Sequence, residues 1–215
     1  MGVAQGKNKK LKKLRKMTVR YFIALKLLAF ICWICGCKIN GRENIPTDSR
    51  IVITANHSSL CDPILVGISF PYQIYFLAKA EFAKISFLRV LLNAFGVIFI
   101  KRGEPDITAL RKAVAVSKDG KAVGLFPEGR RYEEEGLTDF KQGAVFIAQR
   151  TEAAILPVGL INAKNLFKFW RRNVTVNIGN PIYIDYYASD GSKLQLRDIM
   201  DKYTPMIKKE IESLT

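Results

Sequence analysis

Histidine and cysteine are scarce in this sequence, and their scarcity limits the chemistry it can carry. His57 is the only histidine among 215 residues, and three of the four cysteines lie in one apolar stretch near the N-terminus. Cys32 and Cys35 form a C-x-x-C pair, but no second pair follows, so the spacing gives little support to a zinc or redox site. Internal repeats and low-complexity linkers are also lacking. The length therefore favours one domain, with or without an appendage.

Acidic residues are absent from the first 20 positions, while the whole chain carries a net charge of +15. Such an excess favours an anionic partner: nucleic acid, phosphorylated metabolites or anionic lipid. The aromatic-rich segments have the pattern of apolar strands and helices, not of exposed stacking platforms, which disfavours nucleic acid. About half of the excess lies in the N-terminal tail, in Lys7, Lys9, Lys10, Lys12, Lys13, Arg15, Lys16 and Arg20.

The basic tail runs into an apolar segment, residues 21–37, that is interrupted only by Lys26. Measured from Met17 to Cys37, a helix would be about 31 Å long, close to the ~30 Å hydrocarbon core of a bilayer. Lys26 would then lie near mid-depth, at a cost of about 2.5–3.5 kcal/mol. We therefore expect a helix in the interface or in one leaflet, with Lys26 snorkelling, in preference to a clean span. This predicts a peripheral or monotopic protein on the cytoplasmic face of the cell membrane.

Export signals are the alternative explanation of the same segment. No A-x-A cleavage site follows it, which disfavours a secretory signal peptide. A lipoprotein signal is disfavoured because Lys26 shortens the apolar run and Cys35 matches a lipobox poorly. We expect the cysteines to be reduced thiols.

From residue 50 onward, short apolar runs alternate with helical patterns, and this alternation predicts an α/β fold. Most candidate strands are β-branched and nearly all apolar, as expected in a mostly parallel central sheet flanked by helices. The predicted strands are residues 50–56, 73–79, 96–102, 122–128, 154–160 and 174–182. The predicted helices are residues 64–70, 80–95, 106–117, 142–150 and 192–214, the last with a kink or break at Pro205.

One domain boundary is expected, near residue 40, before the breaker-rich loop INGRENIPTDSR. It separates a basic and apolar N-terminal membrane-associating segment, 1–40, from a catalytic domain, 41–215. Within that domain, the helix at 80–95 is apolar on several sides. It is expected to be an ordinary core helix, or else to line an acyl-chain tunnel or contact lipid.

His57 belongs to the stretch NHSSLCDP, directly after a predicted buried strand. Asp62 and Pro63 have a local explanation, since Asp is a good N-cap and Pro suits the first helical position. On one ideal helix His57 and Asp62 would lie about 140° apart, so the two side chains can meet only across a turn. Across such a turn, Asp62 would fix the imidazole tautomer and leave the other ring nitrogen as a base. Backbone N–H groups at the start of the following helix are candidate oxyanion donors.

Three further stretches place polar or unusual residues at the ends of predicted strands. In GVIFIKRGEPD, Lys101 and Arg102 stand at the end of a predicted strand, and this stretch could equally be a solvated strand end. GLFPEGRRYEEEG combines Gly129, which permits close approach of a ligand, with guanidinium groups that suit a phosphate. Its alternative is a surface turn whose charges are balanced by nearby glutamates. Pro157 in ILPVGL marks an edge strand, a bulge or an approach to a site.

Taken together, the His-x4-Asp, Ile-Phe-Ile-x-Arg, Phe-Pro-Glu-Gly-x-Arg and Leu-Pro-Val stretches resemble, in order and rough spacing, the glycerolipid acyltransferase family. Within it the chain is similar, over roughly residues 39–186, to the 1-acyl-sn-glycerol-3-phosphate acyltransferases of bacterial membranes. The resemblance implies that fold, with catalytic His57 and Asp62. It implies that Arg102, supported by Lys101, helps to bind the acceptor phosphate, together with Glu128, Gly129 and Arg131. Pro157 matches the fourth block.

By the same resemblance, His57 would deprotonate the sn-2 hydroxyl of lysophosphatidic acid, which then attacks an acyl thioester to give phosphatidic acid. The implied partners are membrane lipid and acyl carrier protein or coenzyme A as acyl donor, with no metal and no cofactor. Ser58, Ser59 and Cys61 are not needed as nucleophiles. Arg130 stands where the family usually has Thr or Ser, which leaves the acceptor open to another lysolipid or a hydroxylated lipid. A non-catalytic basic membrane-binding protein is the alternative of another class.

Overall fold

The computed structural model describes residues 19–47, 50–79, 97–100, 106–128, 142–166, 168 and 173–215. Its strands are β1 (Lys38–Asn40), β2 (Ile51–Ala55), β3 (Ile74–Lys79), β4 (Ile98–Ile100), β5 (Ala122–Leu125), β6 (Ala154–Ile161) and β7 (Thr175–Ile178). Its α-helices are α1 (Val19–Ile34), α2 (Asp62–Ser69), α4 (Asp106–Lys118), α5 (Gly143–Thr151) and α6 (Leu196–Ser213). Single 3-10 turns occur at Arg42–Asn44 and Ala163–Asn165.

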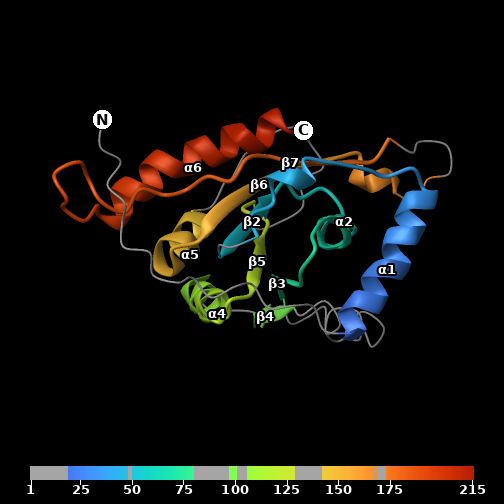
Figure 1. Cartoon of the computed structure of the whole chain (residues 1–215), viewed down its shortest axis with the longest axis horizontal. Coiled ribbons are helices and arrows are strands. Elements are labelled where there is room, and N and C mark those ends of the chain that lie inside the picture. Colours follow the sequence, from blue (N-terminus) through green and yellow to red (C-terminus); the bar gives the residue numbers. More distant parts are fainter. Residues whose placement is uncertain are drawn as a thin grey trace.

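The strands form one sheet in the order β1-β7-β6-β2-β5-β3-β4, with helices on both faces (Figure 1). Every described neighbouring pair is parallel except β6 and β7, which are antiparallel. The predicted α/β class with a mostly parallel sheet is therefore confirmed. Because β2, β3, β4, β5 and β6 run in the same direction, their carboxyl ends share one edge of the sheet.

All five residues of β2 are buried, and successive side chains serve opposite layers. Ile51 and Ile53 belong to the cluster under α1 and α2, whereas Val52 belongs to the cluster under α4, α5 and α6. Burial on both faces explains why this strand is apolar at every position except Thr54 instead of alternating.

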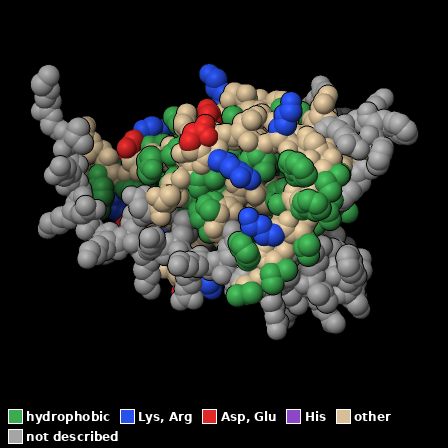
Figure 2. All heavy atoms as spheres, turned by 45° about the vertical axis from the view of Figure 1, so that its right-hand side comes forward, with side chains coloured by type: hydrophobic (Ala, Val, Ile, Leu, Met, Phe, Trp, Pro, Cys, Tyr) green, Lys and Arg blue, Asp and Glu red, His purple; other side chains and the backbone are tan. Residues whose placement is uncertain are grey.

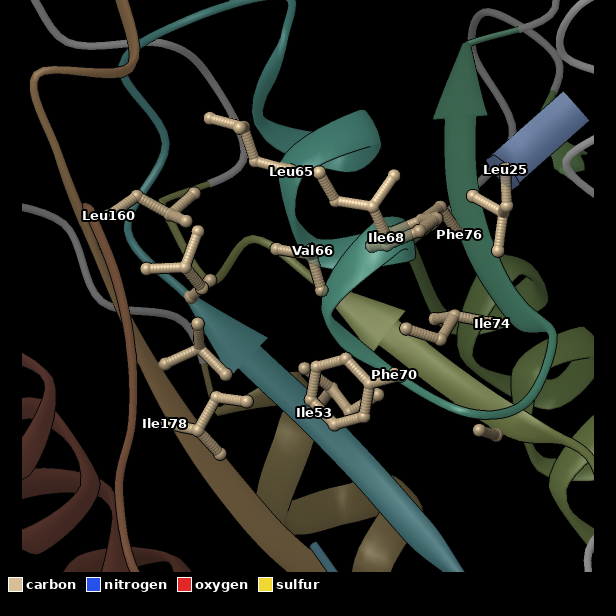
Figure 3. Packing of buried hydrophobic residues seen from close by; sticks show 14 of the residues in the cluster. Leu25, Ile53, Leu65, Val66, Ile68, Phe70, Ile74, Phe76, Leu160 and Ile178 are labelled. Carbon is tan, nitrogen blue, oxygen red and sulfur yellow. The ribbon is translucent and has the colours of Figure 1, made fainter. Parts of the chain in front are cut away.

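The layer under α2 is drawn in Figure 3, where Leu65, Val66 and Ile68 of α2 lie over β2 and β5. α1 joins this layer through Tyr21 and Leu25, and the Ile74 amide donates to the Tyr21 hydroxyl at 3.3 Å. Thus α1 packs on the same core as the catalytic domain predicted from residue 41. Among the described residues, no helix is long and apolar enough to cross a membrane.

The opposite layer is completed by α6, which lies along the sheet in Figure 1. One stripe of α6 is buried, at Ile199, Tyr203, Ile207 and Ile211. This i, i+4 spacing holds the helix against the sheet on both sides of Pro205. Of the predicted kink or break at Pro205, the break is therefore excluded, because α6 is assigned as one helix through this residue.

Two further expectations are corrected by the sheet. Pro157 lies in β6, between β2 and β7, so the edge-strand explanation is excluded. On the other side of β6, Val158 pairs with Ile178 and Ile155 with Ile182. Between these two pairs β6 advances by three residues while the segment after β7 advances by four, so this segment has one extra residue, a β-bulge. The regular strand β7 therefore ends before residue 182. The short strand β1 was not predicted, and the helix expected at 80–95 lies outside the described residues.

Candidate active site

The loop between β2 and α2 leaves the sheet at the shared carboxyl edge, where α/β proteins commonly bind ligands. Asn56 fixes its start: the side-chain amide donates to the Leu160 carbonyl at 2.9 Å, and the Leu160 amide donates back to Asn56 Oδ1 at 2.7 Å. This pair of bonds continues the β2–β6 contact one step beyond the ladder. The next residue, His57, is therefore placed by the sheet.

His57 and Asp62 meet across the turn that the sequence required. His57 Nδ1 lies 2.8 Å from Asp62 Oδ2. The His57 side chain is 18% exposed and that of Asp62 is fully buried. With Nδ1 held by the carboxylate, Nε2 is the ring nitrogen left to face a substrate.

Asp62 Oδ2 also shapes the loop. It accepts hydrogen bonds from the amides of Ser58 at 2.7 Å and Ser59 at 2.8 Å. The carboxylate thus turns back into the loop and does not cap α2, whose N-cap is Cys61. The N-cap explanation of Asp62 is wrong for this reason, while Pro63 does stand in the first turn of α2 as expected.

The imidazole is stacked on a pair of aromatic rings. The His57 ring stacks on Phe126 at 4.2 Å between centroids, and Phe126 stacks on Phe76 at 5.7 Å. Gly124 in β5 makes room for Phe76, since a Cβ there would lie 2.4 Å from a Phe76 ring carbon. The absence of a side chain at Gly124 therefore helps to fix the position of the Phe76 ring, and through Phe126 the position of the His57 ring.

Glu128 approaches the same histidine from the turn after β5. It is 4% exposed, and its Oε2 accepts a hydrogen bond from the His57 backbone amide at 3.3 Å. Burial, aided by the charge of Asp62 and opposed by the bond from the His57 amide, raises the pKa of Glu128 to about 7. The resemblance implied a contact with phosphate; in the structure this carboxyl group contacts His57.

The start of α2 does not supply free oxyanion donors. Asp62 N donates to Ser59 O, Pro63 has no N–H, and Ile64 N and Leu65 N both donate to Cys61 O. The oxyanion role expected for these groups is therefore wrong, because the N–H groups already donate hydrogen bonds within the turn. Burial also raises the pKa of the Cys61 thiol, which disfavours a thiolate nucleophile. All four cysteines are free thiols.

The predicted basic residues lie just beyond the described ones. The description of β4 ends at Ile100 and that of the turn after β5 ends at Glu128, so Lys101, Arg102, Gly129 and Arg131 come next in the sequence. All four lie outside the described residues. Asn56 and Phe126 are the residues of this site that sequence reasoning missed. Their adjacency to His57 and Asp62 in NHSSLCDP and to Glu128 in GLFPE was the available signal.

Comparisons with known proteins agree with this arrangement. Residues 36–161 match the protein family described as Acyltransferase. A 1-acyl-sn-glycerol-3-phosphate acyltransferase of Bacillus subtilis is 32% identical over 83% of this chain and 89% of its own length. One of Borreliella burgdorferi is 36% identical over 71% of this chain, which spans 61% of that relative. The crystal structure of a 1-acyl-sn-glycerophosphate acyltransferase from Thermotoga maritima superposes with a TM-score of 0.64 at 26% identity, covering 90% of this chain and 82% of the other.

Proposed function

Because this chain belongs to the acyltransferase family, we propose that it acylates the sn-2 hydroxyl of 1-acyl-sn-glycerol-3-phosphate to give phosphatidic acid. The acyl donor is a thioester of acyl carrier protein or coenzyme A, and no metal or cofactor is needed. The observation that carries the proposal is the 2.8 Å contact between His57 Nδ1 and the buried Asp62 carboxylate, beside a ring nitrogen left for substrate.

The reaction follows from that contact. His57 Nε2 takes the proton of the acceptor hydroxyl while its oxygen attacks the thioester carbonyl carbon. The tetrahedral intermediate collapses with loss of the C–S bond, and the leaving thiolate takes the proton back from the imidazolium. No bond between enzyme and acyl group forms, so neither serine of the loop is required.

Asp62 makes the imidazole an effective base at neutral pH. It fixes the tautomer, and its negative charge stabilises the imidazolium formed as the proton moves. Both effects are stronger in a buried site than in water, because the effective dielectric constant is lower.

Binding of the acceptor phosphate is assigned to residues just past the ends of β4 and β5. Lys101 and Arg102 follow β4, while Gly129 and Arg131 follow β5. A phosphate held by these side chains would orient the hydroxyl of the same acceptor toward His57, so that binding energy away from the reacting atoms serves the reaction.

For membrane association we propose the outer face of α1, on the peripheral side turned forward in Figure 2, where apolar and basic side chains lie together. Lys26 is exposed on this helix, 5.5 Å from the Phe22 ring centroid, as a snorkelling residue requires. The exposed apolar side chains of α1 are Val19, Phe22, Ile23, Leu27, Phe30, Ile31, Trp33 and Ile34. The 16 residues of α1 that the structure describes, about 24 Å in length, carry their apolar side chains on an exposed face as an interfacial helix does.

The double substitution Leu27→Ser and Trp33→Ser tests this surface. These side chains are 62% and 72% exposed, so the fold should survive while binding to anionic phospholipid vesicles falls at least about tenfold. Flotation with vesicles measures the bound fraction. Tyr187→Ser, at a residue 64% exposed outside α1, is the control and should bind as the wild type does. Unchanged binding of the double variant would remove α1 from the membrane contact.

The proposed reaction is tested with purified protein, lysophosphatidic acid and each of the two donors side by side. We expect phosphatidic acid from at least one donor. Arg131→Ala should lose productive use of phosphorylated acceptors, by about 1.5–3 kcal/mol in kcat/KM for one charged hydrogen-bonding group. A panel of other lysolipids and hydroxylated lipids, run with one labelled donor, tests whether Arg130 has changed the acceptor. Binding to lipid without turnover on any acceptor would favour the non-catalytic alternative.

A further inference from the structure

Glu128 is a buried carboxyl group directed at the catalytic loop. Its exposed fraction is 4%, and its described hydrogen bond is the one from the His57 amide at 3.3 Å. Burying a carboxyl group in its charged form is costly, so the place of Glu128 beside the base calls for a physical reason.

Three contacts hold His57, and two of them come from one turn. Asp62 holds the ring through Nδ1, Phe126 stacks on the ring face, and Glu128 holds the main chain. Phe126 and Glu128 are only two residues apart, directly after β5. That turn fixes both the plane of the imidazole and the backbone that carries it.

We propose that Glu128 is a positioning residue, whose carboxylate holds the His57 backbone so that Nε2 stays aligned with the acceptor hydroxyl. This deepens the proposed function and rests on His57 being its base. It assigns the glutamate of the Glu-Gly-Arg-Arg stretch to the catalytic step, apart from the phosphate contacts expected of Arg131. A charge-assisted bond is the stronger one for this purpose, because an ionised acceptor roughly doubles its strength.

The dependence of the folding stability on pH should show the cost of burying the Glu128 carboxyl group. Burial and the charge of Asp62 raise the pKa of Glu128 from 4.5 to about 7, so the folded state binds a proton that the unfolded state has released. Stability must then fall as pH rises from about 4.5 to 7. Among the described residues, the titratable ones facing Glu128 are His57 and Asp62. A group kept only for packing would serve better as a neutral glutamine.

Glu128→Gln and Glu128→Ala separate positioning from phosphate binding. Glutamine keeps an acceptor but no charge, and we expect kcat to fall about fivefold. Alanine removes the acceptor, and a misplacement of the base should lower kcat by about 100-fold. In both variants the KM for lysophosphatidic acid should stay within about twofold, since binding of the acceptor is unaffected. On the acid side, protonation of Glu128 should add a step of about fivefold to the fall of kcat with pH, and Glu128→Gln should lack this step.

Thermal melts supply the second measurement. The melting temperature of Glu128→Gln relative to wild type should rise between pH 5 and pH 8, as the cost of the buried charge is removed. Glu152→Gln removes the same charge at an exposed residue near the opposite end of β6, and should change neither kcat nor its pH profile.

The outcomes are distinguishable. A raised KM at unchanged kcat would show that Glu128 contributes to phosphate binding. Unchanged kcat in both variants would show that Glu128 does not position the base. Either result overturns the proposal. If Glu128→Ala does not fold, the kcat and pH profile of Glu128→Gln decide alone. Full activity of His57→Ala would instead refute the base mechanism on which this proposal rests, and lack of turnover by the wild type on any acceptor would overturn the proposed function, whatever the Glu128 variants do.

Discussion

His57→Ala is expected to abolish acyl transfer, with kcat reduced by about 10²–10⁴-fold or more, while the protein still folds and binds vesicles. The imidazole is the only group of its kind in the chain, so no second histidine can replace it as general base. Without the ring, Asp62 still accepts the hydrogen bonds from the Ser58 and Ser59 amides, so the loop should keep its turn and the protein should still fold. The measurement is initial-rate kinetics with lysophosphatidic acid and the better donor, alongside a thermal melt.

Cys61→Ala is the matched control for His57→Ala. The thiol lies in the same loop, but burial raises its pKa, so it is a poor nucleophile at neutral pH. Activity should therefore remain near that of wild type. Full activity of His57→Ala would refute the base mechanism. Loss of activity in Cys61→Ala, together with a trapped acyl-enzyme, would replace that mechanism by covalent catalysis.

The parts of the fold that could be predicted are those where burial dictates the residue type. The strand beginning at Ile51 is apolar at successive positions because both faces of β2 are covered, and the same holds for β5 and β6. β1 escaped prediction because its three residues have no such burial and are fixed by pairing with β7. The helix at 192–214 was predicted, but its continuity through Pro205 could not be, because it depends on a buried stripe that overrides the local effect of proline.

The candidate site also has a part that the sequence could predict and a part that it could not. His57 and Asp62 are close in sequence, so their spacing was enough to show that a turn must join them. The contact of Glu128 with the His57 amide joins residues 71 positions apart and depends on β5 being the neighbour of β2. Strand order is a long-range property that no local pattern contains. The resemblance of the Glu-Gly-Arg-Arg stretch therefore indicated its importance but not which of its groups faces the base.

Asp62→Asn is expected to lose nearly as much activity as His57→Ala while remaining folded. Asparagine can keep an oxygen for the amides of Ser58 and Ser59, which Asp62 Oδ2 now accepts at 2.7 and 2.8 Å. It cannot supply the charge that stabilises the imidazolium, and the analogous change in a serine protease triad costs about 10⁴-fold in kcat. Kinetics and a melt on the same preparation should show lost kcat with a nearly unchanged melting temperature.

Asp62→Ala separates the two functions of this carboxylate, because it removes both the charge and the acceptor for the loop. Two buried backbone donors would then lack a partner, at about 1–3 kcal/mol each, so this variant should lose stability as well as activity. Asp185→Asn, an exposed carboxylate bonded to Tyr203, is the control and should keep full kcat. If Asp62→Asn kept wild-type kcat, Asp62 would act only as the anchor of the turn, and His57 would need no charged partner to remove the proton.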